Sequence, residues 1–279
     1  MKRRVLVLTA TFALAGAALA SDAAPERAAV WPRVLRVCAD PNNLPFSDSA
    51  GRGFENRLAE LIAADLGAKV QYTWWAQRRG FVRNTLGAGS CDLIPGVPAR
   101  FDPVATTRPY YRSTYVFVSR RDLVPAIESF DDPRLRRLRV GVHLIGDDHA
   151  NPPPVSALAR RGIVRNVAGY TIYGDYREPN PPARLVEAVA RGDVDVAVVW
   201  GPLGGYFAGR SGAPLRVTPV NRPDDGPTVP FVFAIAMGVR PEDRALARAV
   251  EDVLMRRRAE VRGILKQYGV PLLADGGPT

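Results

Sequence analysis

The feature that most limits how this chain can fold is a repeated alternation of short apolar strands with amphipathic helices. Apolar residues recur at helical spacing from Phe54 to Leu66 and end at Gly67, a typical helix C-cap. The first run is expected to hold strands at 34–38, 70–74 and 92–94 and helices at 54–66 and 81–86. Strands that alternate with helices predict βαβ units and a parallel sheet.

The same alternation begins again after a further strand at 115–118. The second run is expected to hold strands at 138–142, 163–167 and 194–199, helices at 155–159 and 185–189, then a strand at 231–239 and a terminal helix from Leu246. Residues 87–93 and 190–196 share one sequence pattern, in which a helix end and a glycine precede an aspartate that begins an apolar strand. We therefore predict an α/β fold of two similar lobes, with a ligand crevice at the carboxyl ends of the strands.

The second lobe is expected to be inserted into the first, so that the terminal helix returns to lobe 1. Lobe 1 is predicted at 33–119 and 230–279, and lobe 2 at 120–229. The glycine-rich segment 201–205 lacks the Lys-Ser/Thr pair of a phosphate-binding loop, and is expected to be a turn with loose helix packing.

The N-terminus resembles an export signal. Basic residues at 2–4 precede an apolar run, and Ala18-Leu19-Ala20 matches a cleavage site, so we expect a signal peptide at 1–20 and a flexible leader at 21–32. The alternative is a membrane anchor. An anchor needs about 20 spanning apolar residues, and this run is shorter. About 259 of the 279 residues remain after cleavage, enough for two lobes, and none of their segments is apolar enough to span a bilayer.

Net charge and cysteine content each leave two alternatives. The formal charge is +10, or about +7 without the basic residues at 2–4, which indicates either acidic partners or only a coding bias towards arginine.

Cys38 and Cys91 are the only cysteines, and an oxidising compartment favours their pairing. Parallel strands would place them about four residues out of register, on the order of 13 Å apart, so we expect two free, buried thiols. With two histidines and no Cys/His cluster, no zinc site is expected.

Several stretches resemble type II periplasmic solute-binding proteins over residues 33–270. They are Val97–Arg100 with Val104 and Thr107–Tyr111, the strand Gly192–Val199, and Pro45-Phe46 after the first strand. The resemblance implies the two-lobed type II fold of solute-binding protein family 3.

Three further stretches resemble a narrower group, the MoxJ/XoxJ accessory proteins of methanol oxidation. They are Leu35–Ser47, Tyr72–Trp75 running into Gln77–Leu86, and Gly146–Asp148. The resemblance implies a periplasmic, non-catalytic protein without a cofactor of its own. It implies as partner a periplasmic quinoprotein (PQQ-dependent) methanol dehydrogenase, with its cytochrome c as a further candidate. Of the calcium and lanthanide types of this enzyme, we expect the lanthanide type.

The sequence departs from the relatives that bind amino acids. Trp200 stands where those relatives have an aspartate for the ligand ammonium, and Val97 replaces a threonine. Asp147 and Asp148 follow Gly146 in a turn that would hold a carboxylate, and they would repel it. Arg100 remains and could still bind a carboxylate. We therefore predict that ordinary L-amino acids are not ligands.

The candidate cleft residues are aromatic, basic and oxygen-bearing side chains near predicted strand ends. They are Asp40, Asn42, Phe46, Trp74, Trp75, Arg78, Arg100, Tyr110, Tyr111, His143, Asp147 and Trp200. For the aromatic residues the alternative is core packing, and for Arg78, with Arg79 and Arg83, it is a solvated helix face. An Asx-type turn at 40–43 is favoured over a metal site, and no metal ligands are assigned.

Two hypotheses about function follow. In the first, the protein binds an apo or immature dehydrogenase in its inter-lobe cleft. In the second, it is a receptor for an ABC transporter, with an aromatic or quinone-like ligand. An enzyme is disfavoured because no G-x-S-x-G or other nucleophile motif is present, and no nucleic-acid partner is expected.

Overall fold

The computed structural model describes residues 33–144, 152–172, 176–221 and 230–274. The predicted signal peptide at 1–20 and leader at 21–32 lie outside these ranges, as do Gly146, Asp147 and Asp148. None of the described helices is both long and apolar enough to cross a membrane. The described residues fall within one packing unit, so the lobe boundaries near 119 and 230 stay a prediction.

The first lobe is built on a parallel pair of strands, β1 (Val34–Ala39) and β4 (Lys69–Trp74). A single bridge between Val37 and Leu93 joins β1 to β5 (Ile94–Pro98). The third strand therefore begins later than the predicted 92–94, because the chain bends at Asp92 before it becomes extended.

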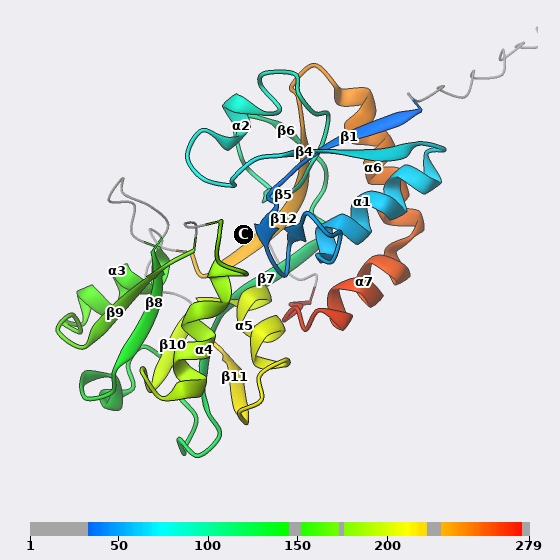
Figure 1. Ribbon diagram of the computed structural model, residues 1–279. Coiled ribbons are helices and arrows are strands. Elements are labelled where there is room, and N and C mark those ends of the chain that lie inside the picture. The colour runs from blue at the N-terminus through cyan, green and yellow to red at the C-terminus, as the bar shows by residue number, and fades with distance from the viewer. Residues whose placement is uncertain (1–32, 145–151, 173–175, 222–229, 275–279) are drawn as a thin grey trace, which may run out of the picture. The chain divides into compact units, whose positions relative to one another are not determined.

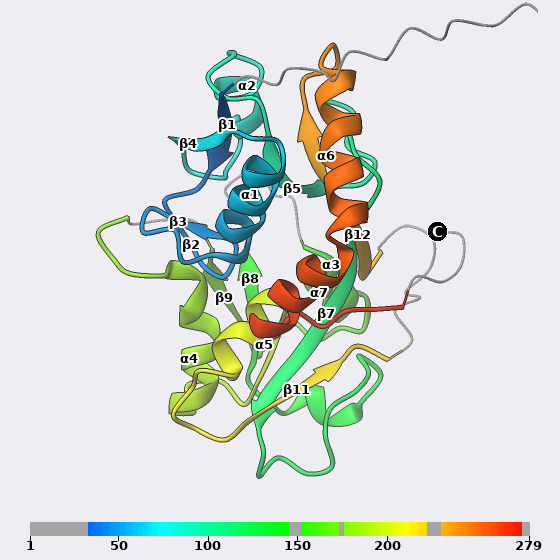
Figure 2. The same ribbon diagram turned by 90° about the vertical axis from the view of Figure 1, so that its right-hand side faces the viewer.

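Three helices cover this sheet and form one core with it. They are α1 (Phe54–Asp65), α6 (Arg244–Arg256) and α7 (Arg258–Gln267), and they lie side by side in Figures 1 and 2. Leu58 and Ile62 of α1 pack with Val250 of α6 and Leu265 of α7. The C-terminal helices thus return to the first lobe, as the inserted-lobe prediction requires.

The second lobe holds three parallel strands, β8 (Val140–Leu144), β9 (Val167–Thr171) and β10 (Val196–Trp200). Its helices are α3 (Pro153–Arg160), α4 (Arg184–Arg191) and α5 (Gly201–Ala208). The strand predicted at 163–167 is wrong: Ile163 packs into the core from a loop, and the strand begins at Val167.

The glycine-rich segment after β10 is helix α5 rather than a turn. A Cβ at Gly204 would lie 2.6 Å from Val116 and 2.7 Å from Val199, so only glycine lets the helix pack this closely on the sheet. The packing is tight where the sequence indicated a loose turn.

The strand β7 (Tyr111–Arg120) belongs to both lobes. Its first residues, 111–114, pair with β12 (Val232–Val239), and its later residues pair with β10 and with β11 (Leu215–Pro219). All these pairings are antiparallel, as is that of β12 with β5, so the sheet is mixed where the sequence predicted parallel strands. Figure 1 shows β7 running between the two groups of strands.

The remaining elements are short. They are β2 (Asn42–Asn43), β3 (Ser47–Asp48), α2 (Phe81–Asn84), β6 (Ala105–Thr106), η1 (Pro133–Arg136) and η2 (Pro181–Ala183).

The prediction of two free thiols is wrong, because Cys38 and Cys91 form a disulfide with their Cα atoms 5.5 Å apart. The register argument assumed an extended chain from Cys91 into the strand. In the structure the carbonyl of Arg36 accepts hydrogen bonds from the main-chain N–H groups of both Asp92 and Leu93. This bend brings Cys91 back beside β1, within the range that a disulfide needs.

Candidate functional site

A cavity of about 380 Å³ is lined by both lobes. Its wall is mainly apolar and aromatic, with three polar side chains. The lining residues are Asn43, Phe46, Glu55, Gln77, Gly96, Val97, Pro98, Tyr111, Tyr115, Pro153, Ile172, Trp200, Leu203, Phe233 and Ile235. An apolar cavity with a few convergent polar groups is the usual form of a ligand site, so this is the candidate functional site.

Three aromatic rings form one wall of the cavity. Trp200, at the end of β10, lies opposite Tyr115 in the β10–β7 ladder, with ring centroids 5.5 Å apart. Phe233 of β12 lies 5.6 Å from Trp200 and 6.4 Å from Tyr115. All three contacts are edge-to-face, the arrangement that the ring quadrupole favours.

Among the described residues of the cavity wall, Glu55 is the one carboxylic acid. It lies in the first turn of α1, only 6% exposed, with its main-chain N–H donating to the carbonyl of Phe46. Within the described residues its carboxyl oxygens have no hydrogen-bond or ion-pair partner. Loss of solvation, with a smaller contribution from Asp40, raises the pKa of Glu55 to about 8.

The space for this carboxyl is created by a glycine. A Cβ at Gly96 of β5 would lie 2.2 Å from Oε1 of Glu55, so any larger residue would displace the carboxyl. Two amides complete the polar part of the wall: Asn43 donates from Nδ2 to Oε1 of Gln77 at 3.0 Å. The buried Oδ1 of Asn43 has no hydrogen-bond partner. No lysine or arginine of the described ranges lines the cavity.

Asp40 and Asn42, both predicted cleft residues, instead join the loop after β1 to residues 176–180. Oδ2 of Asp40 accepts from the Tyr176 hydroxyl at 2.9 Å and from the Gln77 main-chain N–H at 2.7 Å. Asn42 donates from Nδ2 to the carbonyl of Glu178 at 2.8 Å and accepts from the N–H of Asn180 at 3.0 Å. These bonds link segments of the two lobes beside the cavity.

The loop at 40–43 forms the Asx-type turn that the sequence favoured. Oδ1 of Asp40 accepts from the main-chain N–H of Asn42 at 2.9 Å. Among the described residues, no three His, Cys, Asp or Glu side chains cluster as they would around a metal ion.

The structure brings only some of the predicted aromatic residues together. Phe46, Tyr111 and Trp200 line the cavity, whereas Trp74 stacks on Tyr72 with centroids 4.4 Å apart. Trp75 is 44% exposed.

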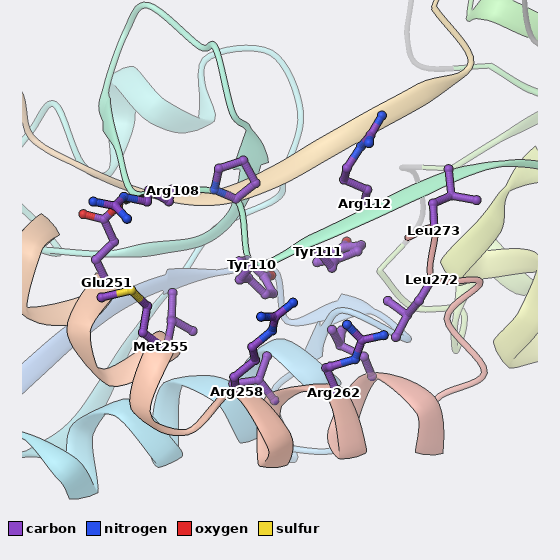
Figure 3. A pocket seen from close by; sticks show the side chains of 14 residues that line it. Arg108, Tyr110, Tyr111, Arg112, Glu251, Met255, Arg258, Arg262, Leu272 and Leu273 are labelled. Carbon is purple, nitrogen blue, oxygen red and sulfur yellow. Dashed lines mark hydrogen bonds and ion pairs between the residues drawn. The ribbon is translucent and has the colours of Figure 1, made fainter. Parts of the chain in front are cut away.

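Tyr110 donates from its hydroxyl to the carbonyl of Pro95 at 3.0 Å and does not line the cavity. It lines a separate cavity of about 240 Å³ between β7 and the C-terminal helices (Figure 3). Arg108, Arg112, Arg258 and Arg262 line this second cavity, and Arg108 forms an ion pair with Glu251. Its basic lining contrasts with that of the first cavity, whose described lining residues include a carboxyl and no cationic side chain.

The other predicted residues lie around or away from the first cavity. Arg78, with Arg79 and Arg83, lines an adjoining hollow that shares Gln77, Gly96, Val97 and Pro98 with it. Arg100 is exposed and lines neither this hollow nor the cavity.

His143 is buried at the end of β8, and burial lowers its pKa to about 4 despite a hydrogen bond to the Pro182 main chain. It does not line the cavity. Asp147 lies outside the described residues.

Sequence reasoning missed Tyr115, Phe233, Glu55 and Gln77. Tyr115 lies mid-strand and Phe233 near a strand start, so a search at the carboxyl ends of strands passes over them. Glu55 carried no clear signal, because it stands beside the polar residues Asn56 and Arg57 and is indistinguishable by pattern from a solvent-exposed helix residue.

No family model matches the chain. It is 35% identical to "Protein MoxJ" of Methylorubrum extorquens over 95% of this chain and 92% of that protein. It is 30% identical to "Protein MoxJ" of Paracoccus denitrificans over 93% of this chain and 95% of that protein. The crystal structure of the periplasmic binding protein XoxJ from Methylobacterium extorquens AM1 covers 86% of this chain and all of its own, at 36% identity and a TM-score of 0.72. The chain therefore belongs to the MoxJ/XoxJ family, whose members share the two-lobed fold of periplasmic binding proteins.

Proposed function

We propose that this protein is a non-catalytic periplasmic accessory protein of methanol oxidation, which binds an apo or immature quinoprotein methanol dehydrogenase in its inter-lobe cleft. Membership of the MoxJ/XoxJ family supports the link to methanol oxidation. The lanthanide-type enzyme is the proposed partner, and binding to both types of dehydrogenase tests this choice, because the MoxJ and XoxJ relatives are about equally similar to this chain, at 35% and 36% identity. Export through residues 1–20 accounts for the proposed location in the periplasm.

One observation carries the proposal that the cleft holds a protein partner. The aromatic wall of Tyr115, Trp200 and Phe233 adjoins a hollow that is lined by Arg78, Arg79 and Arg83. Aromatic and arginine side chains dominate the energetics of protein interfaces. A basic rim also speeds the encounter with an acidic partner, and salt weakens this effect within a Debye length of about 8 Å.

A receptor for a small ligand remains the second candidate, and a different observation favours it. The cavity, at about 380 Å³, lies within the range of small-molecule sites, and it contains an unpartnered buried carboxyl. The ligand would not be an ordinary amino acid, because no lysine or arginine among the described residues lines the wall to hold its carboxylate, and Trp200 takes the place of the aspartate that holds the ammonium in amino-acid receptors.

Binding kinetics against purified apo forms of the lanthanide-type and calcium-type dehydrogenases test the proposal. We expect Trp200→Ala to raise the dissociation rate, with a loss of about 2 kcal/mol, or roughly 30-fold in Kd. Trp75→Ala is the matched control, because that ring is 44% exposed and lies outside the cavity. It should bind like the wild type. If neither dehydrogenase binds the wild type, the receptor function is favoured; equal binding by folded Trp200→Ala would exclude the cleft as the interface.

A further inference from the structure

Glu55 is the group in the cavity that the proposed function leaves unused. A carboxyl buried to this degree in the core of a protein normally has a hydrogen-bond or ionic partner, because burying it alone is costly. Here α1 presents it to the cavity wall and Gly96 makes room for it, yet no described residue binds its oxygens. The structure therefore maintains a polar group that an occupant of the cavity could satisfy.

The other groups around Glu55 favour a donor with a positive charge. The other polar side chains among the described residues of the wall, Asn43 and Gln77, are neutral amides that bond to each other, so Glu55 is the acidic group that an occupant would meet. Trp200, Tyr115 and Phe233 add aromatic rings, whose faces attract cations. A carboxyl group beside an aromatic wall is the chemistry that recognises an ammonium group on an apolar stem.

We propose that this cavity binds an organic cation, a primary ammonium on an unbranched apolar stem, with the ammonium on Glu55 and the stem against the aromatic wall. The inference rests on the cleft being the binding site but not on which partner enters it. Two sources have this chemistry: a free alkylamine, and a lysine side chain of the bound polypeptide.

The same wall excludes ligands that carry a carboxylate. An α-amino acid would place its ammonium near Glu55 but would bury its carboxylate in a cavity that no described lysine or arginine lines. The second cavity, lined by Arg108, Arg112, Arg258 and Arg262 (Figure 3), has the opposite chemistry. The selectivity of the first cavity therefore follows from its own wall rather than from the net charge of the chain.

Binding should depend on pH with a defined sign. The titratable groups that interact with Glu55 are Asp40 after β1, Tyr72 on β4, Tyr110 just before β7 and Tyr111 on β7, and none of them is cationic. Because burial raises the pKa of Glu55 to about 8, an ammonium must displace its proton below that pH. Affinity should then rise up to about tenfold for each pH unit between pH 6 and 8, while an alkylamine stays protonated with a pKa near 10.

Titration calorimetry of the purified mature protein with n-butylammonium chloride tests the inference, with n-pentanol and valerate as neutral and anionic probes of similar size. We expect n-butylammonium to bind at least tenfold more tightly than either at pH 8, with proton release at pH 7. Glu55→Gln should lose at least tenfold in affinity for n-butylammonium and lose the pH dependence. Glu60→Gln is the matched control, because Glu60 is exposed on the same helix, and it should bind like the wild type.

Equal binding of n-pentanol and n-butylammonium by the wild type would overturn the inference, and so would no binding of n-butylammonium at millimolar concentration. Neither result depends on whether Glu55→Gln folds. Competition identifies the source: displacement of the dehydrogenase by n-butylammonium indicates a lysine of the partner, and simultaneous binding indicates a free amine. If the wild type binds the dehydrogenase but does not prefer n-butylammonium over n-pentanol and valerate, this inference alone is overturned. If the wild type prefers n-butylammonium but does not bind the dehydrogenase, only the proposed partner is overturned.

Discussion

Replacing Glu55 by glutamine should change how the stability of this protein depends on pH. Burial raises the pKa of Glu55 from 4.5 to about 8, so the folded chain keeps a proton that the unfolded chain releases near pH 4.5. Between these two values the unfolded state binds fewer protons than the folded state. The free energy of unfolding therefore falls by about 1.4 kcal/mol for each pH unit, and by about 5 kcal/mol in all.

His143 has the opposite effect at lower pH. Burial lowers the pKa of His143 from 6.5 to about 4, so the unfolded state binds more protons than the folded state between those values. Its contribution makes stability rise with pH from about 4 to 6.5. In the wild type, Glu55 and His143 change the free energy of unfolding in opposite directions between about pH 4.5 and 6.5. Between pH 6.5 and 8, of these two groups only Glu55 contributes. The wild type should thus lose about 2 kcal/mol between pH 6.5 and 8.

Urea unfolding at pH 5, 6.5 and 8, followed by tryptophan fluorescence, measures this difference. Glu55→Gln should show no loss between pH 6.5 and 8 and should gain stability between pH 5 and 6.5, where the titration of His143 acts alone. The exposed Glu60→Gln should follow the wild type. Parallel pH profiles for the wild type and Glu55→Gln would refute the reasoning, because they would mean that the Glu55 carboxyl is solvated or paired in solution.

Further predictions concern the disulfide, the ligand and the basic rim. Cys38→Ser with Cys91→Ser should lower the free energy of unfolding by about 4 kcal/mol, the loop-entropy value for a separation of 53 residues, measured by urea unfolding with and without reductant. An unchanged midpoint would contradict it. Calorimetry with the ordinary L-amino acids should show no binding tighter than millimolar, and micromolar binding of any one would contradict the exclusion based on Trp200. Arg78→Glu should slow association with the dehydrogenase and flatten its salt dependence with little change in dissociation rate, whereas an effect confined to dissociation would place Arg78 inside the contact rather than at its rim.

The sequence by itself determined the fold class and most of the elements. The helical spacing of Phe54, Leu58 and Ile62 placed α1, and the apolar run at 194–199 placed β10, because periodicity reports which face of an element is buried. Trp200, at a position that is polar in amino-acid receptors, also indicated an unusual cleft. Two predictions failed for local reasons. Ile163 was assigned to a strand because it is apolar, but it reaches the core from a loop. The helix at 201–208 was missed because its glycines are more typical of a turn.

Only the tertiary structure decided how distant residues meet. The bend at Asp92 brings Cys38 to Cys91, and the antiparallel pairing of β7 with β10 and β12 gathers Tyr115, Trp200 and Phe233 at one wall. The charge state of Glu55 likewise depends on the lack of a partner in a cavity that both lobes line. Hydrophobic periodicity encodes burial within one element, whereas strand direction, register and the solvation of a carboxyl depend on contacts between elements, which no local pattern contains.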